Sequence, residues 1–334
     1  MPDHQAAKVA SASHLSIAQR GWRALHDLRE RIAPARPIGR AWKPAVSGED
    51  AGHLIYTTLE RPAPALIARF GAGELEAVLR HLAIGGGGVR LASHLRYLLG
   101  AAPAPWWDAA FLSAMELHTG LFPATPQMLA RFADRMLADV PSVDILGSWL
   151  PGERTLVSLG LKAKRVPLVD LEPYYHTAPW SRVLRGRTVL VVHPLADLIR
   201  AQFAKRERLF PDREVLPQFT LRTVTAIVSN AGARPKHADW FEALDAMTQS
   251  IAGQSFDVAI IGAGAYGLPL AAAVKRMGRQ AVHLGGATQI LFGIRGRRWD
   301  EMPFFQRLFN AAWVHPDLTN RPPRWHDVEG GCYW

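Results

Sequence analysis

Three glycines in the last third of the chain have the spacing of a phosphate-binding turn. Gly262, Gly264 and Gly267 follow a short apolar run, residues 258–261, and precede a stretch with helical periodicity. A turn with this G-x-G-x-x-G spacing lets backbone N–H groups approach a phosphate closely at the positive end of the following helix. The spacing therefore predicts a strand, a phosphate-approaching turn and a helix that ends at Gly278.

The same glycines have a second interpretation, in which they only permit tight packing of the strand against the helix. An ordinary dinucleotide site also carries an acidic residue about twenty positions after the turn, where it binds the adenosine ribose. Here the next apolar segment ends in His283-Leu284-Gly285-Gly286 instead. The sequence thus argues against an ordinary dinucleotide site, and both interpretations of the glycines stay open.

Four further residues that could act as bases or ligands lie at or just after the ends of other apolar segments. Glu74 comes just after the segment 65–71, Asp170 and Glu172 end the segment 165–171 or follow it, and His193 ends the segment 188–193. Ligands gather at the carboxyl ends of the strands in open α/β sheets, so Glu74, Asp170 or His193 could serve as a general base. Asp170 and Glu172 could also chelate a hard cation through oxygen.

Each of these residues also has a structural interpretation. Glu74 falls in the first turn of an expected helix, where a carboxylate complements the helix dipole. Asp170 and Glu172 could be solvated loop carboxylates, and a histidine in the position of His193 is often structural. Later in the chain, Arg295, Arg297 and Arg298 stand among glycines. They form either a phosphate clamp, because guanidinium groups pair with phosphate oxygens in a two-pronged fashion, or a plain basic loop.

The elements that position these residues alternate between strand and helix. Residues 60–290 predict one α/β domain with a mainly parallel sheet flanked by helices. We expect residues 1–55 to be a basic leader with a helix near residues 17–32, and residues 56–334 to be a single Rossmann-like domain. The C-terminal extension is rich in aromatic residues and should fold back on the body. We expect strands at residues 65–71, 143–147, 165–171, 188–193, 219–228 and 258–261. We expect later helices at residues 74–82, 126–140 and 239–251, the last capped by Asp239.

Composition narrows the classes of partner. The chain of 334 residues carries 39 Lys and Arg against 29 Asp and Glu. This excess favours anionic partners, namely nucleotide diphosphates, phospholipid headgroups or nucleic acid, although a generally soluble basic surface explains it as well. Cys332 is the only cysteine, so the chain has no internal disulfide, which suits a reducing cytoplasm. No signal peptide is visible, and the longest uncharged run, residues 258–274, is shorter than the roughly twenty residues that span a membrane.

Two stretches taken together resemble a known family. Ala68-Arg69-Phe70-Gly71-Ala72-Gly73-Glu74 and Gly262-Ala263-Gly264 with His283-Leu284-Gly285-Gly286 resemble the paired signatures of the GT-D-type glycosyltransferases. The part from Glu172 to Trp334 also resembles uncharacterised proteins associated with bacterial surface-polysaccharide loci. The resemblance covers most of the chain after residue 60.

The resemblance implies a Rossmann-like fold that transfers a hexosyl group from a nucleotide-sugar donor to a glycan or lipid-linked acceptor. It implies nucleotide-sugar binding by Arg69, Gly71, Gly262, Gly264, Gly267, His283, Gly285, Gly286, Arg295 and Arg298. The family usually holds Mn²⁺ or Mg²⁺ through an Asp-x-Glu motif, whose Asp corresponds to Ala72 and whose Glu corresponds to Glu74. This chain therefore keeps only half of the motif.

Three outcomes fit that departure from the family. The protein could transfer sugar without a metal by using its arginines, hold a metal through Asp170 and Glu172 together with Glu74, or bind a nucleotide sugar as a non-catalytic subunit. A dinucleotide-dependent oxidoreductase is the rival class of enzyme. We expect a cytoplasmic protein that touches the inner membrane face through its basic surface, and no nucleic-acid partner.

Overall fold

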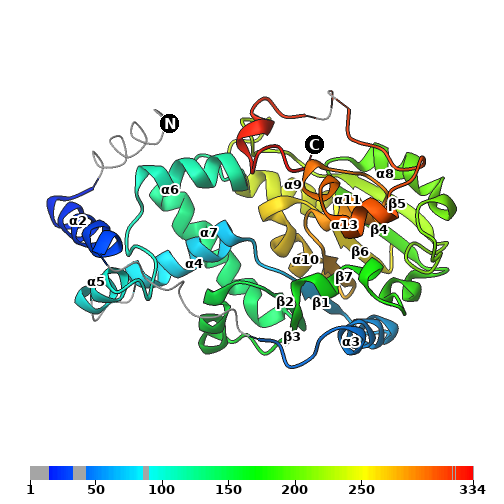
Figure 1. The fold of residues 1–334 in the computed structure, drawn as a ribbon, viewed down its shortest axis with the longest axis horizontal. Helices are drawn as coiled ribbons and strands as arrows, with labels where there is room; N and C mark the ends of the chain where they lie inside the picture. The colour runs from blue at the N-terminus through cyan, green and yellow to red at the C-terminus, as the bar shows by residue number, and fades with distance from the viewer. Residues whose placement is uncertain (1–14, 33–42, 86–89, 318, 320, 334) are drawn as a thin grey trace.

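The computed structural model describes residues 15–32, 43–85, 90–317, 319 and 321–333 (Figure 1). The expected leader lies partly outside these ranges, as do most of the glycine run at residues 85–88 and the last residue, Trp334. Within the leader, the expected helix is present as α2 (Ile17–Ile32).

In the described part of the chain, seven strands form one parallel sheet in the order β3-β2-β1-β7-β6-β4-β5. This confirms the expected α/β fold. The strands are β1 (Ala65–Ala68), β2 (Ile145–Ser148), β3 (Lys164–Pro167), β4 (Thr188–His193), β5 (Thr220–Thr225), β6 (Val258–Ile261) and β7 (Gln280–His283).

Helices cover both faces of the sheet (Figure 1), because the strand residues point alternately to one face and to the other. In β6, Ala259 and Ile261 join one hydrophobic cluster, whereas Val258 and Ile260 join the cluster on the opposite face. The first cluster includes residues of α4 (Ala72–Gly85), α7 (Pro126–Asp139), α9 (Trp240–Ala252) and α10 (Gly267–Arg276). The second includes residues of α3 (Glu49–Glu60), α8 (Ala196–Phe203), α11 (Ala287–Leu291), α12 (Arg297–Asp300) and α13 (Pro303–Leu308).

The remaining described helices are α5 (Arg90–Leu98), α6 (Ala109–Ala114) and a π-helical turn at Met115–Thr119. Short 3₁₀ segments span Val140–Ser142, Pro151–Leu159, Leu168–Leu171, Pro173–Tyr175, Trp180–Leu184, Arg206–Arg208, Gly264–Tyr266 and Trp325–Asp327. The expected cap of α9 is confirmed, since the Asp239 carboxylate accepts hydrogen bonds from the backbone N–H groups of Phe241 at 2.8 Å and Glu242 at 2.9 Å.

The strand expected at residues 165–171 is shorter than the sequence indicated. β3 ends at Pro167, which has no N–H to give to a continued ladder. Residues 168–171 then form a 3₁₀ turn. As a consequence, Asp170 lies in this turn and not at the end of a strand.

The order of the strands creates a crevice near the middle of the sheet. From β1 the chain enters α4 on one face, whereas from the neighbouring β7 it enters α11 on the other face. Connections that leave adjacent strands toward opposite faces open a crevice at the carboxyl ends of those strands, where α/β proteins bind ligands. The next pairs along the sheet diverge in the same way, because β6 leads into α10 on the first face, whereas its neighbours β7 and β4 lead into α11 and α8 on the other.

The C-terminal segment folds back over this edge of the sheet, as the sequence indicated. Val328 and Cys332 are buried. Tyr333 lies against the turn after β7, where a Cβ atom on Gly286 would be 2.3 Å from its ring. Among the described residues, no helix has the length and apolar character needed to cross a membrane.

Candidate functional site

A cavity of about 560 Å³ lies at the carboxyl ends of the central strands. Its walls come from the turns after β1, β2, β4, β5, β6 and β7, from the π-helical turn and from the C-terminal segment. The cavity brings together most of the residues singled out in the sequence, namely Arg69, Gly71, Glu74, His193, Gly262, Gly264, His283, Gly285, Gly286 and Arg298. Five others, Gly267, Asp170, Glu172, Arg295 and Arg297, do not line it.

Glu74 is the third residue of α4, and its carboxylate folds back over the turn that precedes the helix. A Cβ atom on Gly71 would lie 1.9 Å from Glu74 Oε2, so only glycine leaves room for this conformation. Burial raises the pKa of the Glu74 carboxyl, while its own backbone N–H and the Arg69 guanidinium act in the opposite direction. Glu74 is thus a carboxylate with increased basicity that faces the cavity.

Arg69 supplies positive charge to the same cavity. Its guanidinium lies over the Trp149 ring, 5.2 Å from the ring centroid, and makes long hydrogen bonds of 3.3 and 3.4 Å to the carbonyl oxygen of Phe70. Among the described residues, Arg69 forms no ion pair with a carboxylate. Glu74 and Glu172 sense the charge of Arg69, but neither carboxylate is in contact with it. A half-buried cation without a contacting carboxylate attracts an anionic ligand, because its charge is only partly compensated.

The glycines after β6 serve two different purposes. A Cβ atom on Gly262 would lie 2.6 Å from the His193 ring, and one on Gly267 would lie 1.9 Å from the His283 ring. These two glycines therefore permit tight packing. Gly264 has a φ of +54°, and a Cβ atom there would meet no atom within 4 Å. It lines the cavity just before the N-terminus of α10, so its backbone remains open to a ligand.

Two buried histidines lie behind this turn. His193 Nδ1 accepts a 3.0 Å hydrogen bond from the N–H of Leu195, so the neutral ring carries its proton on Nε2. His283 Nδ1 lies 3.3 Å from the carbonyl oxygen of Ile261 and donates its proton to it. Burial lowers the pKa of each histidine to about 3. His193 is therefore suited to donate a hydrogen bond, and its geometry disfavours the role of general base that its position suggested.

Asp170 and Glu172 are engaged in the structure outside the cavity. The Asp170 carboxylate accepts a 2.7 Å hydrogen bond from the N–H of Gly48, which precedes α3. The Tyr174 hydroxyl donates a hydrogen bond to Glu172. Burial raises the pKa of Glu172 to about 7, and its hydrogen bond with Tyr174 and the charges of Arg69 and Arg298 counteract that rise. The structure does not bring Asp170 or Glu172 into one site with Glu74.

The three arginines after β7 do not form a common clamp. Arg298 lines the cavity, where it pairs with Glu329 and lies 5.2 Å from the ring centroid of Tyr333. Arg295 pairs with Asp300 at 3.0 Å and does not line the cavity. Arg297 donates a 3.3 Å hydrogen bond to the carbonyl oxygen of Gly330. Only one member of the expected clamp is therefore placed to meet a ligand.

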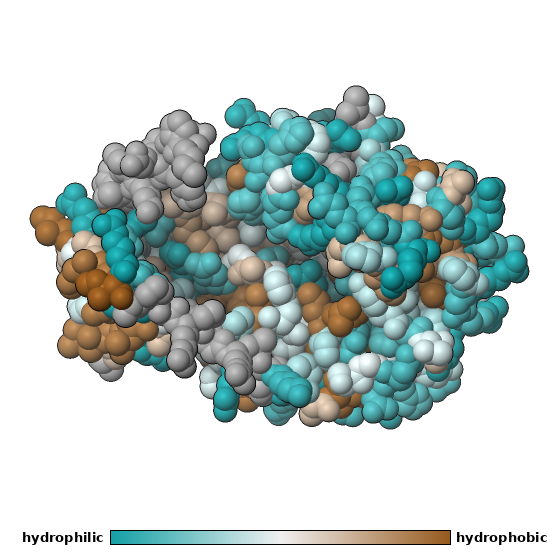
Figure 2. Space-filling view, in the orientation of Figure 1, coloured by the Kyte–Doolittle hydropathy of each residue, from teal (hydrophilic) through white to brown (hydrophobic). Residues whose placement is uncertain are grey.

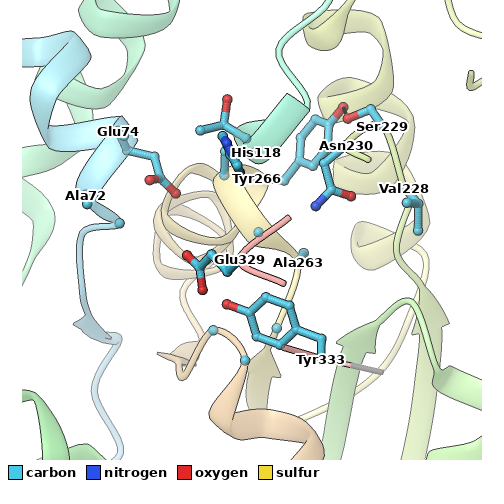
Figure 3. Close-up of a pocket in the computed structure, with 18 of the residues that line it drawn as sticks. Ala72, Glu74, His118, Val228, Ser229, Asn230, Ala263, Tyr266, Glu329 and Tyr333 are labelled. Carbon is cyan, nitrogen blue, oxygen red and sulfur yellow. Dashed lines mark hydrogen bonds between the residues drawn. The ribbon is translucent and has the colours of Figure 1, made fainter. Parts of the chain in front are cut away.

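Several cavity residues were not identified from the sequence. Figure 3 shows the Glu74 carboxylate on one side and the Glu329 carboxylate and Tyr333 hydroxyl on the other, around a common space. Ser229 and Asn230 follow β5, and their position after an expected strand was the signal that could have found them. Glu329 and Tyr333 lie far from the other site residues in the sequence, so no spacing rule places them there.

Tyr266 and Ser229 connect three of the segments that form the cavity wall. Ser229 Oγ donates a 2.7 Å hydrogen bond to the carbonyl oxygen of Gly120, so it accepts from the Tyr266 hydroxyl at 2.9 Å. The Tyr266 ring also stacks on Trp240 with a centroid distance of 4.7 Å. This network fixes the turn after β6 against the π-helical turn, an element that is frequent at functional sites.

The residues do not fit the metal site of the resembled family. Ala72 offers no ligand oxygen, Asp170 is bound to Gly48, and only Glu74 of the expected ligands reaches the cavity. In the described ranges, no three His, Cys, Asp or Glu side chains are grouped so that they could hold a metal ion.

Comparison of the chain with known proteins gave no match: no family profile, curated protein or solved structure shows significant similarity to it.

Proposed function

We propose that the cavity binds a nucleoside-diphosphate sugar and that the protein transfers the sugar to an acceptor hydroxyl. The observation that carries this proposal is the guanidinium of Arg69, which faces the cavity without a carboxylate partner among the described residues. The open turn at Gly264 and the Glu74 carboxylate line the same cavity. This combination provides an anion site next to a base.

The diphosphate would occupy the region of Arg69 and the turn at Gly264. The N-terminus of α10 follows this turn directly, and its backbone N–H groups carry partial positive charge. When the bond between the sugar and the diphosphate breaks, negative charge grows on the leaving diphosphate. Arg69 and the helix N-terminus can stabilise that charge without a metal.

Glu74 is the best candidate for the general base. In an inverting transfer, the acceptor oxygen forms a bond to the anomeric carbon as the diphosphate leaves, and the acceptor's proton passes to the base. The raised pKa of the Glu74 carboxyl makes it a stronger proton acceptor than an exposed glutamate. His193 would donate a hydrogen bond from Nε2 and not accept the proton.

The size and lining of the cavity agree with such a donor. Its volume of about 560 Å³ falls in the range of roughly 300–1,000 Å³ that is usual for small-molecule sites. An oxidoreductase is less well supported, because the strand after α10 ends in His283 and lacks the acid that binds a ribose in dinucleotide sites. We propose a glycan or lipid-linked acceptor and a cytoplasmic location, which the single buried Cys332 suits.

A thermal-shift screen followed by a transfer assay tests this function. The screen would compare nucleotide sugars, free nucleoside diphosphates, NAD(H) and flavins, each with and without Mn²⁺. We expect nucleotide sugars and their diphosphates to raise the melting temperature, and mass spectrometry to detect sugar transfer or donor hydrolysis. Stabilisation by NAD(H) alone, or a yellow protein with bound flavin, would contradict the proposal. Tight donor binding with no turnover would reduce it to a binding subunit.

A further inference from the structure

α2 turns its apolar side toward solvent. Ile17, Leu25, Leu28 and Ile32 are 81%, 52%, 53% and 75% exposed. With 3.6 residues per turn, these four positions fall on one face of the helix. In a globular protein such a face normally packs on the core, so its exposure requires an explanation.

The opposite face of α2 holds the helix to the protein through aromatic and polar groups. The Trp22 ring lies 5.2 Å from the His94 ring, and the His26 ring stacks on Tyr97 at 4.3 Å. Because His94 and Tyr97 belong to α5, the two helices pack side by side with the apolar side of α2 left outside.

α5 adds a second exposed apolar row. Leu91, Leu95 and Leu99 are 61%, 43% and 69% exposed and recur every four residues. Figure 2 shows hydrophobic residues gathered at the end of the molecule that α2 and α5 form. We call the group of Ile17, Leu25, Leu28, Ile32, Leu91, Leu95 and Leu99 the end patch. Contiguous apolar surface of this kind usually marks an interaction site.

Positive charge borders the end patch. Arg20, Arg31 and Arg96 are exposed, and α5 contains no acidic residue. Of the two acidic residues of α2, Glu30 pairs with Arg29 and Asp27 lies 3.6 Å from His26. A helix that combines an exposed apolar face with many polar residues, and that carries arginines beside the apolar face, is typical of elements that lie in the plane of a lipid interface.

We propose that the end patch docks the protein onto an anionic lipid bilayer. The apolar side chains would enter the boundary between headgroups and acyl chains, and the arginines would pair with lipid phosphates. A second copy of the chain fits less well, because it would place Arg20, Arg31 and Arg96 against their own like charges. The inference is independent of what the cavity binds.

Vesicle co-sedimentation of the full chain tests the docking surface. The probes are vesicles of phosphatidylcholine alone and of phosphatidylcholine with phosphatidylglycerol. We expect binding to the anionic vesicles that weakens as salt is added. The double variant Leu25→Glu/Leu28→Glu should bind at least about tenfold more weakly, and Arg20→Gln/Arg31→Gln should weaken binding to anionic vesicles only.

Val169→Glu is the matched control, because Val169 is 42% exposed and lies in the 3₁₀ turn after β3, outside the end patch. It should bind vesicles like the wild type, and circular dichroism should show the same helix content in all variants. Wild-type protein that ignores anionic vesicles would overturn the proposal, as would equal binding by Leu25→Glu/Leu28→Glu and Val169→Glu. Light scattering that shows a dimer lost in the double variant would assign the end patch to a second copy.

Discussion

The turn after β6 and the turn after β3 make an instructive pair. Both follow parallel strands of the same sheet, and both carry residues that the sequence marked for ligand binding. The turn after β6 opens into the cavity through Gly264, whereas Asp170 and Glu172 lie outside it. β6 is an interior strand, paired with both β7 and β4, whereas β3 is an edge strand, paired only with β2.

The difference shows that the carboxyl end of a parallel strand is not by itself a site: the turn after β6 reaches the cavity, whereas the turn after β3, at the edge of the sheet, does not. After the edge strand β3, the polar side chains form hydrogen bonds that stabilise the fold. Asp170 satisfies the N–H of Gly48 at the start of α3, and Glu172 accepts from Tyr174. At the centre, Arg69 and Glu74 face a cavity, and no hydrogen bond or ion pair joins them to each other among the described residues.

The largest expected effect is a difference in ligand binding between variants at two glycines, one before α10 and one after it. Gly264 and Gly278 have φ values of +54° and +80°, and neither would bring a Cβ atom within 4 Å of another atom. Valine at either position therefore costs similar backbone strain, about 1–3 kcal/mol. We expect Gly264→Val to abolish the thermal shift with a nucleotide sugar, since its side chain would keep the phosphates away from the backbone of the turn. Gly278→Val should keep it, and equal shifts in both variants would place the ligand elsewhere.

A second comparison sets Glu74 against Asp170. Glu74→Gln should lower turnover by roughly a hundredfold or more with little change in melting temperature, because the amide cannot accept the proton. Asp170→Asn should leave turnover intact and cost about 1 kcal/mol of stability through its weaker hydrogen bond to Gly48. Steady-state kinetics and thermal melts measure both. Full activity in Glu74→Gln would show that Glu74 is not the general base.

The pH dependence of turnover should carry the signature of Glu74. A base must be ionised to accept a proton, and burial raises the pKa of this carboxyl above the ordinary value of 4.5. Turnover should therefore rise with pH along a limb that lies above that value. A rate that is flat from pH 4 upward would argue against Glu74 as the base.

Arg69 and Arg295 provide a smaller contrast. Arg69→Gln should weaken donor binding by about ten- to a hundredfold, because a charge-assisted contact to phosphate is lost. Arg295→Gln should leave donor affinity unchanged, since Arg295 pairs with Asp300 outside the cavity. Isothermal titration calorimetry measures both affinities. Equal losses in the two variants would restore the clamp expected from the sequence.

The smallest expected effect concerns stability at the β3 side of the molecule. Burial raises the pKa of Glu172 from 4.5 to about 7, so the folded state binds this proton more tightly than the unfolded state. The stability that it contributes is complete below about pH 4.5 and is lost as pH rises through about 7, by at most about 3 kcal/mol. Glu172→Gln should remove this part of the pH dependence of urea denaturation without lowering turnover. An unchanged slope would contradict this assignment.

Local patterns in the sequence were sufficient to predict most of the strands and helices and the turns at their ends. The apolar run before Gly262 and the cap at Asp239 each depend on neighbouring residues, and the structure has β6 and the cap of α9 at those positions. The strand predicted at residues 165–171 was too long, because the apolar residues continue beyond Pro167, where β3 ends.

The cavity depends on contacts that no local pattern encodes. Strand order decides that β1 lies beside β7, although their sequences are far apart. The same long-range packing brings Tyr333 against Gly286 and Glu329 against Arg298. The glycine spacing was informative in part only, because the histidines that require Gly262 and Gly267 come from other segments of the chain.

The most direct test of the central claim is a crystal structure of the protein with a nucleoside diphosphate such as uridine or guanosine diphosphate. We expect the diphosphate in the cavity, between the turns that follow β1 and β6, with phosphate oxygens within hydrogen-bond distance of the Arg69 guanidinium and of the backbone at Gly264. A diphosphate bound instead beside Asp170 and Glu172, or a cavity that stays empty while the ligand binds elsewhere, would contradict the account.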